Sequence, residues 1–140
     1  MFQTVMTMRT FISISVLICT TLLPAEAGAG QAIPFTREQV DRGNATYIQY
    51  CQICHGTTLA NGQFGAPLRG SFFRNNWSGK SLGELVKYTY ESMPPDNVMS
   101  LAPEQYAEVV AFILDANKVP ASDMPISGDF KAMGGIMLPW

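Results

Sequence analysis

Two cysteines that are separated by two residues and followed directly by a histidine form the run CQICH at residues 51–55. This spacing is the attachment signature of c-type haem. The thiols of Cys51 and Cys54 can each add to one vinyl group of the porphyrin. His55 is then brought beneath the iron and can bind it through one imidazole nitrogen. The motif therefore predicts one covalently attached haem, a group that mostly handles electrons.

Two other kinds of site share the C-x-x-C spacing. A redox dithiol is expected near a βαβ pattern, and no such pattern is visible around residues 45–65. A structural zinc site takes four ligands. Outside the first residues of the chain there are only two cysteines and one histidine, so carboxylates would have to complete the set. Covalent haem is the favoured interpretation, with dithiol chemistry and zinc as the alternatives.

Residues 1–27 have the pattern of a secretory signal peptide. Arg9 supplies a positive charge, residues 11–23 are apolar apart from serines and threonines, and Ala25 and Ala27 fit the small-x-small cleavage pattern. The apolar run is short for a membrane span. We therefore expect cleavage after residue 27, export through the Sec route to the periplasm, and no stable membrane span afterwards. A retained membrane anchor is the alternative.

Cleavage would leave one small domain with few charges. The remaining 113 residues (140 − 27) can bury only part of their surface, so the haem would supply much of the core. The formal net charge is −2 and no basic stripe is present, which argues against nucleic acid as a partner. Cys19 leaves with the leader, and the thioether bonds would use the two remaining cysteines, so no disulfide framework is available. We expect a haem domain over residues 28–120 and an irregular tail over 121–140.

Two capping boxes predict helices on either side of the haem motif. Thr36 is followed three residues later by a glutamine, which predicts a helix that runs into the motif. Ser81 is followed at the same spacing by a glutamate and predicts a second helix, which ends before Pro94 because a residue preceding proline disfavours helix. The glycine- and proline-rich stretch 56–79 is predicted to be a loop that wraps the flat cofactor.

A third helix is predicted after Pro103, which suits the first helical position. Apolar residues recur at helical spacing over 106–114, and Asn117 and Pro120 end the pattern. No strand alternation of comparable length is present, so the fold class expected is all-α. The glycines and prolines of residues 121–140 argue against regular structure, and the sequence leaves open whether this tail folds back or is disordered.

The second axial position of the iron needs another ligand, and the chain contains no second histidine. A methionine thioether is the natural candidate because soft sulfur stabilises ferrous iron and raises the reduction potential. Met93 is followed by two prolines, which stiffen the loop that would hold its sulfur at the iron. Met93 is therefore the predicted ligand. Met99 in the same loop is its competitor, and an open site or another ligand is the third alternative.

These features together resemble class I cytochromes c, the small single-haem electron carriers. The resemblance covers about residues 35–119. It rests on CQICHG at 51–56, GAPLRG at 65–70, Met93 with its proline, and VAFI at 110–113. It implies an all-α cytochrome c fold in which three to four helices wrap around one haem c.

The resemblance also implies roles for individual residues. The two cysteines carry the thioethers, and His55 and Met93 are the axial ligands of the iron. Pro67 matches the proline whose carbonyl accepts a hydrogen bond from the ligand histidine, a contact that fixes the ring. Leu68 would pack on the haem. Trp77 matches an aromatic residue near a haem propionate, with its N–H as donor, and packing in the core is the alternative role.

One glycine stands inside the first predicted helix. Gly43 costs about 1 kcal/mol relative to alanine at such a position. The resemblance implies that Gly43 and Tyr47 meet Val109 and Phe112 where the first and last helices cross, which would explain the glycine by close approach. A merely tolerated glycine is the alternative.

The function that the resemblance implies is electron transfer by a periplasmic protein that is not an enzyme on its own. The loop MPPD at 93–96 and the helix over 106–114 look like those of cytochrome partners or domains of quinoprotein alcohol dehydrogenases. This implies a periplasmic dehydrogenase as electron donor and another cytochrome or a terminal oxidase as acceptor. The alternatives are a subunit fixed to a haem- or quinone-cofactor enzyme complex, and a haem enzyme or gas sensor whose distal ligand is displaceable.

Overall fold

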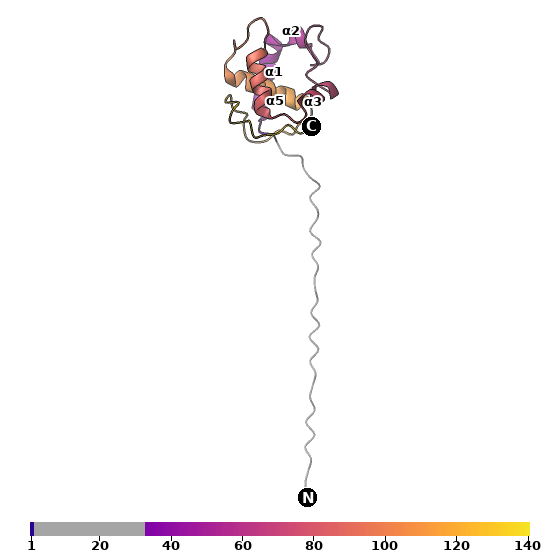
Figure 1. The fold of residues 1–140 in the computed structure, drawn as a ribbon, viewed down its shortest axis with the longest axis vertical. Coiled ribbons are helices and arrows are strands. Elements are labelled where there is room, and N and C mark those ends of the chain that lie inside the picture. Colours follow the sequence, from indigo (N-terminus) through magenta and orange to yellow (C-terminus); the bar gives the residue numbers. More distant parts are fainter. Residues whose placement is uncertain (2–32) are drawn as a thin grey trace.

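The computed structural model of the protein describes Met1 and residues 33–140, so the predicted leader, including Cys19, lies outside the described residues. The described part is helical, and its only β-pairing is an isolated bridge between Ser81 and Met137. The predicted all-α fold is confirmed (Figure 1). The helices are α1 (Arg37–Tyr50), α2 (Gln52–His55), α3 (Ser71–Trp77), α4 (Leu82–Ser92) and α5 (Pro103–Ala116).

Both capping boxes begin helices where the sequence predicts them. The backbone N–H of Gln39 donates to the hydroxyl of Thr36 over 3.3 Å at the start of α1. At the start of α4, the N–H of Glu84 donates to the hydroxyl of Ser81 over 3.2 Å. The carboxylate of Glu84 in turn accepts the N–H of Ser81, and these bonds hold the pKa of Glu84 below its ordinary value. The helix ends at Ser92, and Met93 is its C-cap, directly before two prolines.

The stretch 56–79, predicted to be a loop, contains the helix α3, and in this respect the prediction is wrong. The helix has only seven residues, and Gly70 gives it no side-chain cap. Its stability comes instead from packing, which can override weak local signals. The buried ring of Phe73 lies 6.2 Å from the ring of Trp77 and 5.7 Å from that of Trp140, measured between ring centres.

Helices α1 and α5 cross in close contact near the middle of the fold (Figure 1). A Cβ atom added at Gly43 would overlap the backbone carbonyl of Glu108 and crowd the amide of Val109. One turn further along α1, the rings of Tyr47 and Phe112 lie 5.3 Å apart between centres. Close approach of the two helices therefore explains the glycine inside α1.

Replacing Gly43 with alanine is expected to destabilise the protein, because the added methyl group meets backbone that cannot move aside. Overpacking of this kind costs about 1–3 kcal/mol, and occasionally more. Urea or thermal unfolding of the purified protein would measure the loss. Gly135→Ala is the matched control, since a Cβ at Gly135 meets nothing within 4 Å. Equal stability of the two variants would contradict the close approach.

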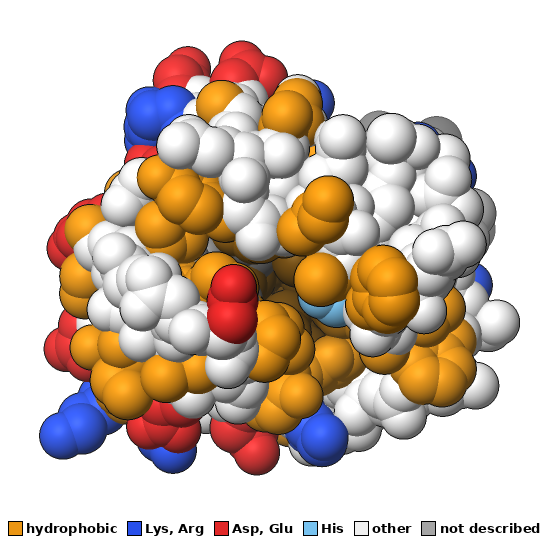
Figure 2. All heavy atoms as spheres, turned by 90° about the horizontal axis from the view of Figure 1, so that it is seen from above, with side chains coloured by type: hydrophobic (Ala, Val, Ile, Leu, Met, Phe, Trp, Pro, Cys, Tyr) orange, Lys and Arg blue, Asp and Glu red, His pale blue; other side chains and the backbone are white. Residues whose placement is uncertain are grey.

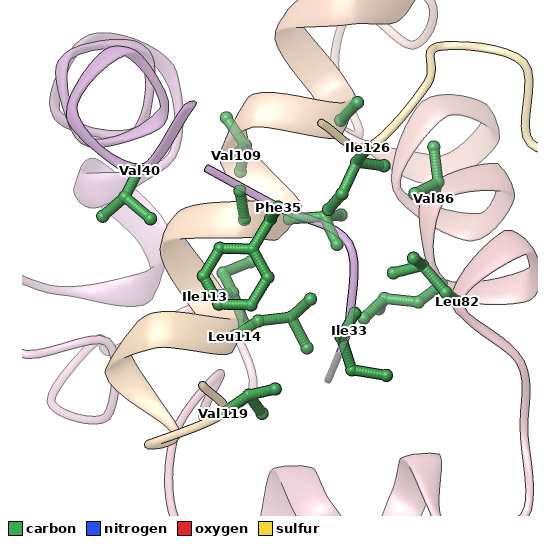
Figure 3. Close-up of a cluster of buried hydrophobic side chains, with 14 of the residues drawn as sticks. Ile33, Phe35, Val40, Leu82, Val86, Val109, Ile113, Leu114, Val119 and Ile126 are labelled. Carbon is green, nitrogen blue, oxygen red and sulfur yellow. The ribbon is translucent and has the colours of Figure 1, made fainter. Parts of the chain in front are cut away.

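The hydrophobic core lies between α1, α4 and α5 and takes in the segments that flank them (Figure 3). Ile33 and Phe35, just before α1, are fully buried against this core. Val119 and Ile126 join it from beyond the end of α5. The core therefore extends past the three helices that the sequence predicts. In the part of the chain that the structure describes, no helix has the length and apolar character needed to cross a membrane.

Residues 121–140 contain no α-helix and fold back over the body of the protein, along the side opposite α2 in Figure 1. The side-chain amide of Gln39 donates to the carbonyl of Ile126 and accepts its N–H, each over 2.8 Å. The N–H of Leu82 donates to the carbonyl of Ile136 over 2.7 Å. Of the two arrangements that the sequence leaves open, the structure has the packed one.

Candidate functional site

A cavity of about 780 Å³ opens on one face of the fold. This volume lies within the range of about 300–1,000 Å³ that is typical of ligand pockets. Figure 2 shows the hollow bordered mostly by hydrophobic side chains, with the pale blue of the histidine inside it. Six of the seven residues that the sequence nominates for cofactor binding line the cavity, namely Cys51, Cys54, His55, Leu68, Trp77 and Met93.

The end of α1 and the single turn of α2 position the C-x-x-C-H motif. The N–H of Cys51 donates to the carbonyl of Tyr47 over 2.9 Å, which continues the hydrogen bonding of α1 into the motif. The N–H of His55 then donates to the carbonyl of Cys51 over 3.0 Å. Residues four apart in such a turn lie on the same face. The first thiol and the imidazole therefore border the cavity together.

The ring of His55 is oriented by one hydrogen bond. Its Nδ1 lies 2.8 Å from the carbonyl oxygen of Ala66. Because a carbonyl can only accept, Nδ1 carries the proton and the lone pair of the neutral ring is left on Nε2, as a metal ligand requires. A Cβ at Gly65 would overlap this ring, so the glycine lets the loop approach it closely.

The acceptor for His55 is thus Ala66, and the prediction that the carbonyl of Pro67 plays this part is wrong. A residue that precedes proline is held in extended conformations. We attribute the direction of the Ala66 carbonyl toward the imidazole to this restriction, together with the close approach of Gly65.

The two thiols of the motif are free in the structure and border the same cavity. Burial, with a smaller contribution from the charge of Cys54, raises the pKa of the Cys51 thiol to about 11. Reactive redox thiols depend instead on a lowered pKa, because the thiolate is the nucleophile. The raised pKa of Cys51 is therefore the opposite of what a reactive redox thiol typically shows.

Met93 is the only methionine among the described residues that lines the cavity. Its competitor Met99 lies in the same loop but is 51% exposed and is not part of the lining. Helix α2 packs on α1, and α4, which has Met93 as its C-cap, packs on α5. The histidine and the methionine thus border the cavity from the C-terminal ends of different helices, an arrangement that could place one on each face of a flat cofactor.

The ring of Trp77 lies at the edge of the cavity. It packs edge-on against Tyr88, with 5.6 Å between ring centres, and the ammonium group of Lys80 lies 4.8 Å above its ring. Leu68 lines the cavity from the loop that follows Ala66. These positions are compatible with the expected packing of Leu68 and hydrogen bonding of Trp77, and both roles stay predictions.

Sequence reasoning missed the part that Asn117 plays beside the cavity. The sequence pattern predicts this residue only as the end of the third helix. In the structure its buried side-chain amide takes part in three hydrogen bonds. The side-chain NH₂ donates to the carbonyl of Leu68 over 2.9 Å, and the side-chain oxygen accepts the N–H of Gly70 over 3.0 Å. Asn117 therefore ties the loop that carries Leu68 to the end of α5. The available signal in the sequence was an asparagine placed directly after a strongly apolar helix, where a buried side-chain amide needs hydrogen-bond partners.

Two tyrosine hydroxyls were also missed. The sequence places Tyr47 and Tyr106 on apolar helix faces. In the structure, Tyr47 donates to the carbonyl of Gly56 over 2.6 Å, and Tyr106 donates to that of Met93 over 2.8 Å. Buried tyrosine hydroxyls usually find such partners. Their presence on buried faces was a signal, but the identity of the partners depends on the tertiary fold.

The family model described as "Cytochrome C oxidase, cbb3-type, subunit III" matches residues 38–113. The matched region is more than half of the chain. It runs from the first turn of α1 to the last turn of α5 and includes both cysteines, the histidine and Met93. Comparison with curated proteins and with solved structures found no significant match.

Proposed function

The chain belongs to this family of class I c-type cytochromes, so it binds haem c covalently and transfers electrons, and we propose that it does so in the periplasm with a single haem held by Cys51, Cys54, His55 and Met93. The two cysteines form the thioethers, and the histidine and methionine bind the iron. The observation that carries this proposal is that one cavity gathers both thiols, the imidazole and a single methionine.

The residues around the cavity fit a haem in their chemistry as well as in their positions. The lone pair of His55 is on Nε2 because Nδ1 is engaged by Ala66, and the thioether of Met93 is a soft ligand. When bound, the haem iron supplies one-electron chemistry by alternating between its ferric and ferrous states. The chain orients the two ligands, and its largely apolar walls limit the access of water, which tunes the potential.

The mouth of the cavity supports a protein as the electron-transfer partner. Ile53 and Tyr88 belong to the lining and are 83% and 52% exposed. Asp96 is the only aspartate, glutamate, lysine or arginine in the lining, within the part of the chain that the structure describes. Exposed apolar patches of this kind mark interaction sites. We propose that a redox partner docks here, chiefly through apolar contact.

The proposed donor is a periplasmic dehydrogenase of the quinoprotein alcohol dehydrogenase kind, and the proposed acceptor is another cytochrome or a terminal oxidase. The loop at 93–96 and the sequence of α5 support the donor. On this proposal the protein is a carrier, or a non-catalytic subunit of a dehydrogenase complex, rather than an enzyme on its own. The signal-peptide pattern of residues 1–27 supports export.

A visible absorption spectrum of periplasm-expressed protein tests the proposed ligation. We expect a c-type spectrum in the oxidised and dithionite-reduced protein that carbon monoxide changes only slowly, because methionine occupies the distal position. The control is a host without the haem-attachment machinery, which should yield protein without the spectrum. A reduced spectrum that shifts at once with carbon monoxide would contradict methionine ligation and favour a sensor or haem enzyme.

A further inference from the structure

The chain segments that carry the two proposed iron ligands are each held by a buried tyrosine. Tyr47 on α1 and Tyr106 on α5 are 1% and 2% exposed. The hydroxyl of Tyr47 donates to the carbonyl of Gly56, the residue after His55. The hydroxyl of Tyr106 donates to the carbonyl of Met93 itself. Each tyrosine thus holds the segment of one proposed iron ligand. The two segments differ in how many other restraints they have.

The proximal segment has several other restraints. On the proposed function, thioether bonds at Cys51 and Cys54 attach it to the haem, one of them directly before His55. The turn of α2 and the bond from His55 Nδ1 to Ala66 add to these. Loss of the Tyr47 hydroxyl would therefore remove one restraint among many. We expect it to cost stability without freeing the histidine from the iron.

The distal segment has no covalent restraint. Met93 is the C-cap of α4, and the residues that follow it up to Leu101 form a loop in which Met99 is half exposed. The Tyr106 hydroxyl meets this loop at both ends, since it donates to the carbonyl of Met93 over 2.8 Å and accepts the N–H of Leu101 at 3.5 Å. Both ends of the loop line the cavity.

Tyr106 itself is firmly placed. It lies on α5, which packs on both α1 and α4. Its ring is edge-on to that of Tyr90, with 5.3 Å between centres, and Tyr90 lies 6.2 Å from Phe130 of the folded-back tail. A hydroxyl that is placed by this packing can hold the neighbouring loop in one position.

We propose that Tyr106 is a positioning residue for the distal ligand: its hydroxyl closes the loop from Met93 to Leu101 and keeps the methionine sulfur at the iron. The proposal rests on the proposed function, because it takes Met93 as the ligand. Without the hydroxyl, the carbonyl of Met93 loses its partner on α5. The loop then opens more often, and Met93 leaves the iron more often.

The test compares three variants that each lose one hydroxyl. Tyr106→Phe removes the proposed tie, Tyr47→Phe removes its proximal counterpart, and Tyr90→Phe removes a hydroxyl from the ring beside Tyr106. Three readouts are taken on the haem-loaded proteins. They are the rate of carbon monoxide binding to the reduced form, the far-red charge-transfer band between iron and methionine sulfur in the oxidised form, and thermal unfolding.

Tyr106→Phe is expected to bind carbon monoxide roughly tenfold faster than the wild type and to show a weaker charge-transfer band. A tenfold change corresponds to about 1.4 kcal/mol, near the net contribution of one hydrogen bond. Tyr47→Phe should unfold at a lower temperature. Its rate of carbon monoxide binding should lie within about twofold of the wild-type rate, which corresponds to much less free energy than one hydrogen bond contributes. Tyr90→Phe should match the wild type in carbon monoxide binding.

A double-mutant comparison tests whether Tyr106 affects carbon monoxide binding through Met93. Once Met93→Ala has removed the sulfur, Tyr106→Phe should not change carbon monoxide binding further, because coupled residues do not act additively. An additional increase in this background would overturn the proposal, as would equal rates for Tyr106→Phe and Tyr47→Phe. A wild type that lacks the charge-transfer band would show instead that Met93 does not bind the iron. The proposed role of Tyr106 would then be wrong as well.

Discussion

Replacing both Cys51 and Cys54 with alanine is expected to yield a protein that carries no covalently bound haem. Both thiols border the cavity and are free of disulfides, so each is available for one thioether bond. Without them the haem could be held only by axial ligands, which denaturants break. Haem staining after denaturing electrophoresis measures the covalent fraction directly, and we expect it to fall to background.

The same double variant is also expected to fold poorly. A cavity of about 780 Å³ in so small a domain leaves its apolar lining without contacts when no cofactor fills it. Its thermal unfolding should therefore be less cooperative and occur at a lower temperature than that of the haem-loaded protein. Leu68 and Phe73 are among the lining residues that would lose contacts. Because Phe73 also packs against Trp140, the loss would extend to the tail.

Cys19→Ala is the matched control for the number of cysteines. The sequence places Cys19 in the predicted leader, so this variant should keep all of its covalent haem. Single replacements of Cys51 or Cys54 should leave at most one thioether. Normal haem staining of the Cys51→Ala/Cys54→Ala protein would disprove the proposed attachment, and loss of staining in Cys19→Ala through failed export would be detected by immunoblotting the periplasmic fraction.

The parts of the fold that the sequence predicts are those governed by local chemistry. Thr36 and Ser81 begin helices because their hydroxyls accept backbone N–H groups three residues later. Each of these bonds lies within a stretch of four residues. The contact at Gly43 was predicted through the resemblance to a known family. Periodicity alone leaves a glycine inside a helix ambiguous between close approach and tolerance.

The parts that the sequence does not predict depend on contacts between distant segments. Helix α3 is short and lacks a side-chain cap, and it is stabilised by Phe73 packing on a residue 67 positions later, Trp140. The fold of the tail depends on Gln39, whose amide bonds to Ile126 across 87 positions. No pattern within a window of ten or fifteen residues contains this information.

The candidate site shows the same division. The sequence nominates the residues that carry chemistry by type and spacing, and six of the seven line one cavity. It does not find the groups that orient them. The acceptor for His55 is a backbone carbonyl, that of Ala66, which has no side-chain signature. The partner of Tyr106 is likewise a carbonyl, and only the crossing of α4 and α5 brings the two together.

Met93→Ala is expected to leave the haem attached while lowering its reduction potential, on the order of a hundred millivolts, since axial ligands set haem potentials over about 0.8 V. The thioether sulfur stabilises ferrous iron, and its removal withdraws that stabilisation. The reduced variant should also bind carbon monoxide rapidly. Redox titration followed by visible absorption measures the potential, and haem staining confirms that the cofactor is still covalently attached.

Met99→Ala is the matched control, because it removes the same side chain from the same loop. Met99 is 51% exposed and lies outside the cavity lining, so its loss should leave both the potential and the carbon monoxide response as in the wild type. If Met99→Ala lowered the potential and Met93→Ala did not, the loop would have to rearrange on cofactor binding and present the second methionine. The hydroxyl of Tyr106 would then hold the wrong residue, since its partner is the carbonyl of Met93.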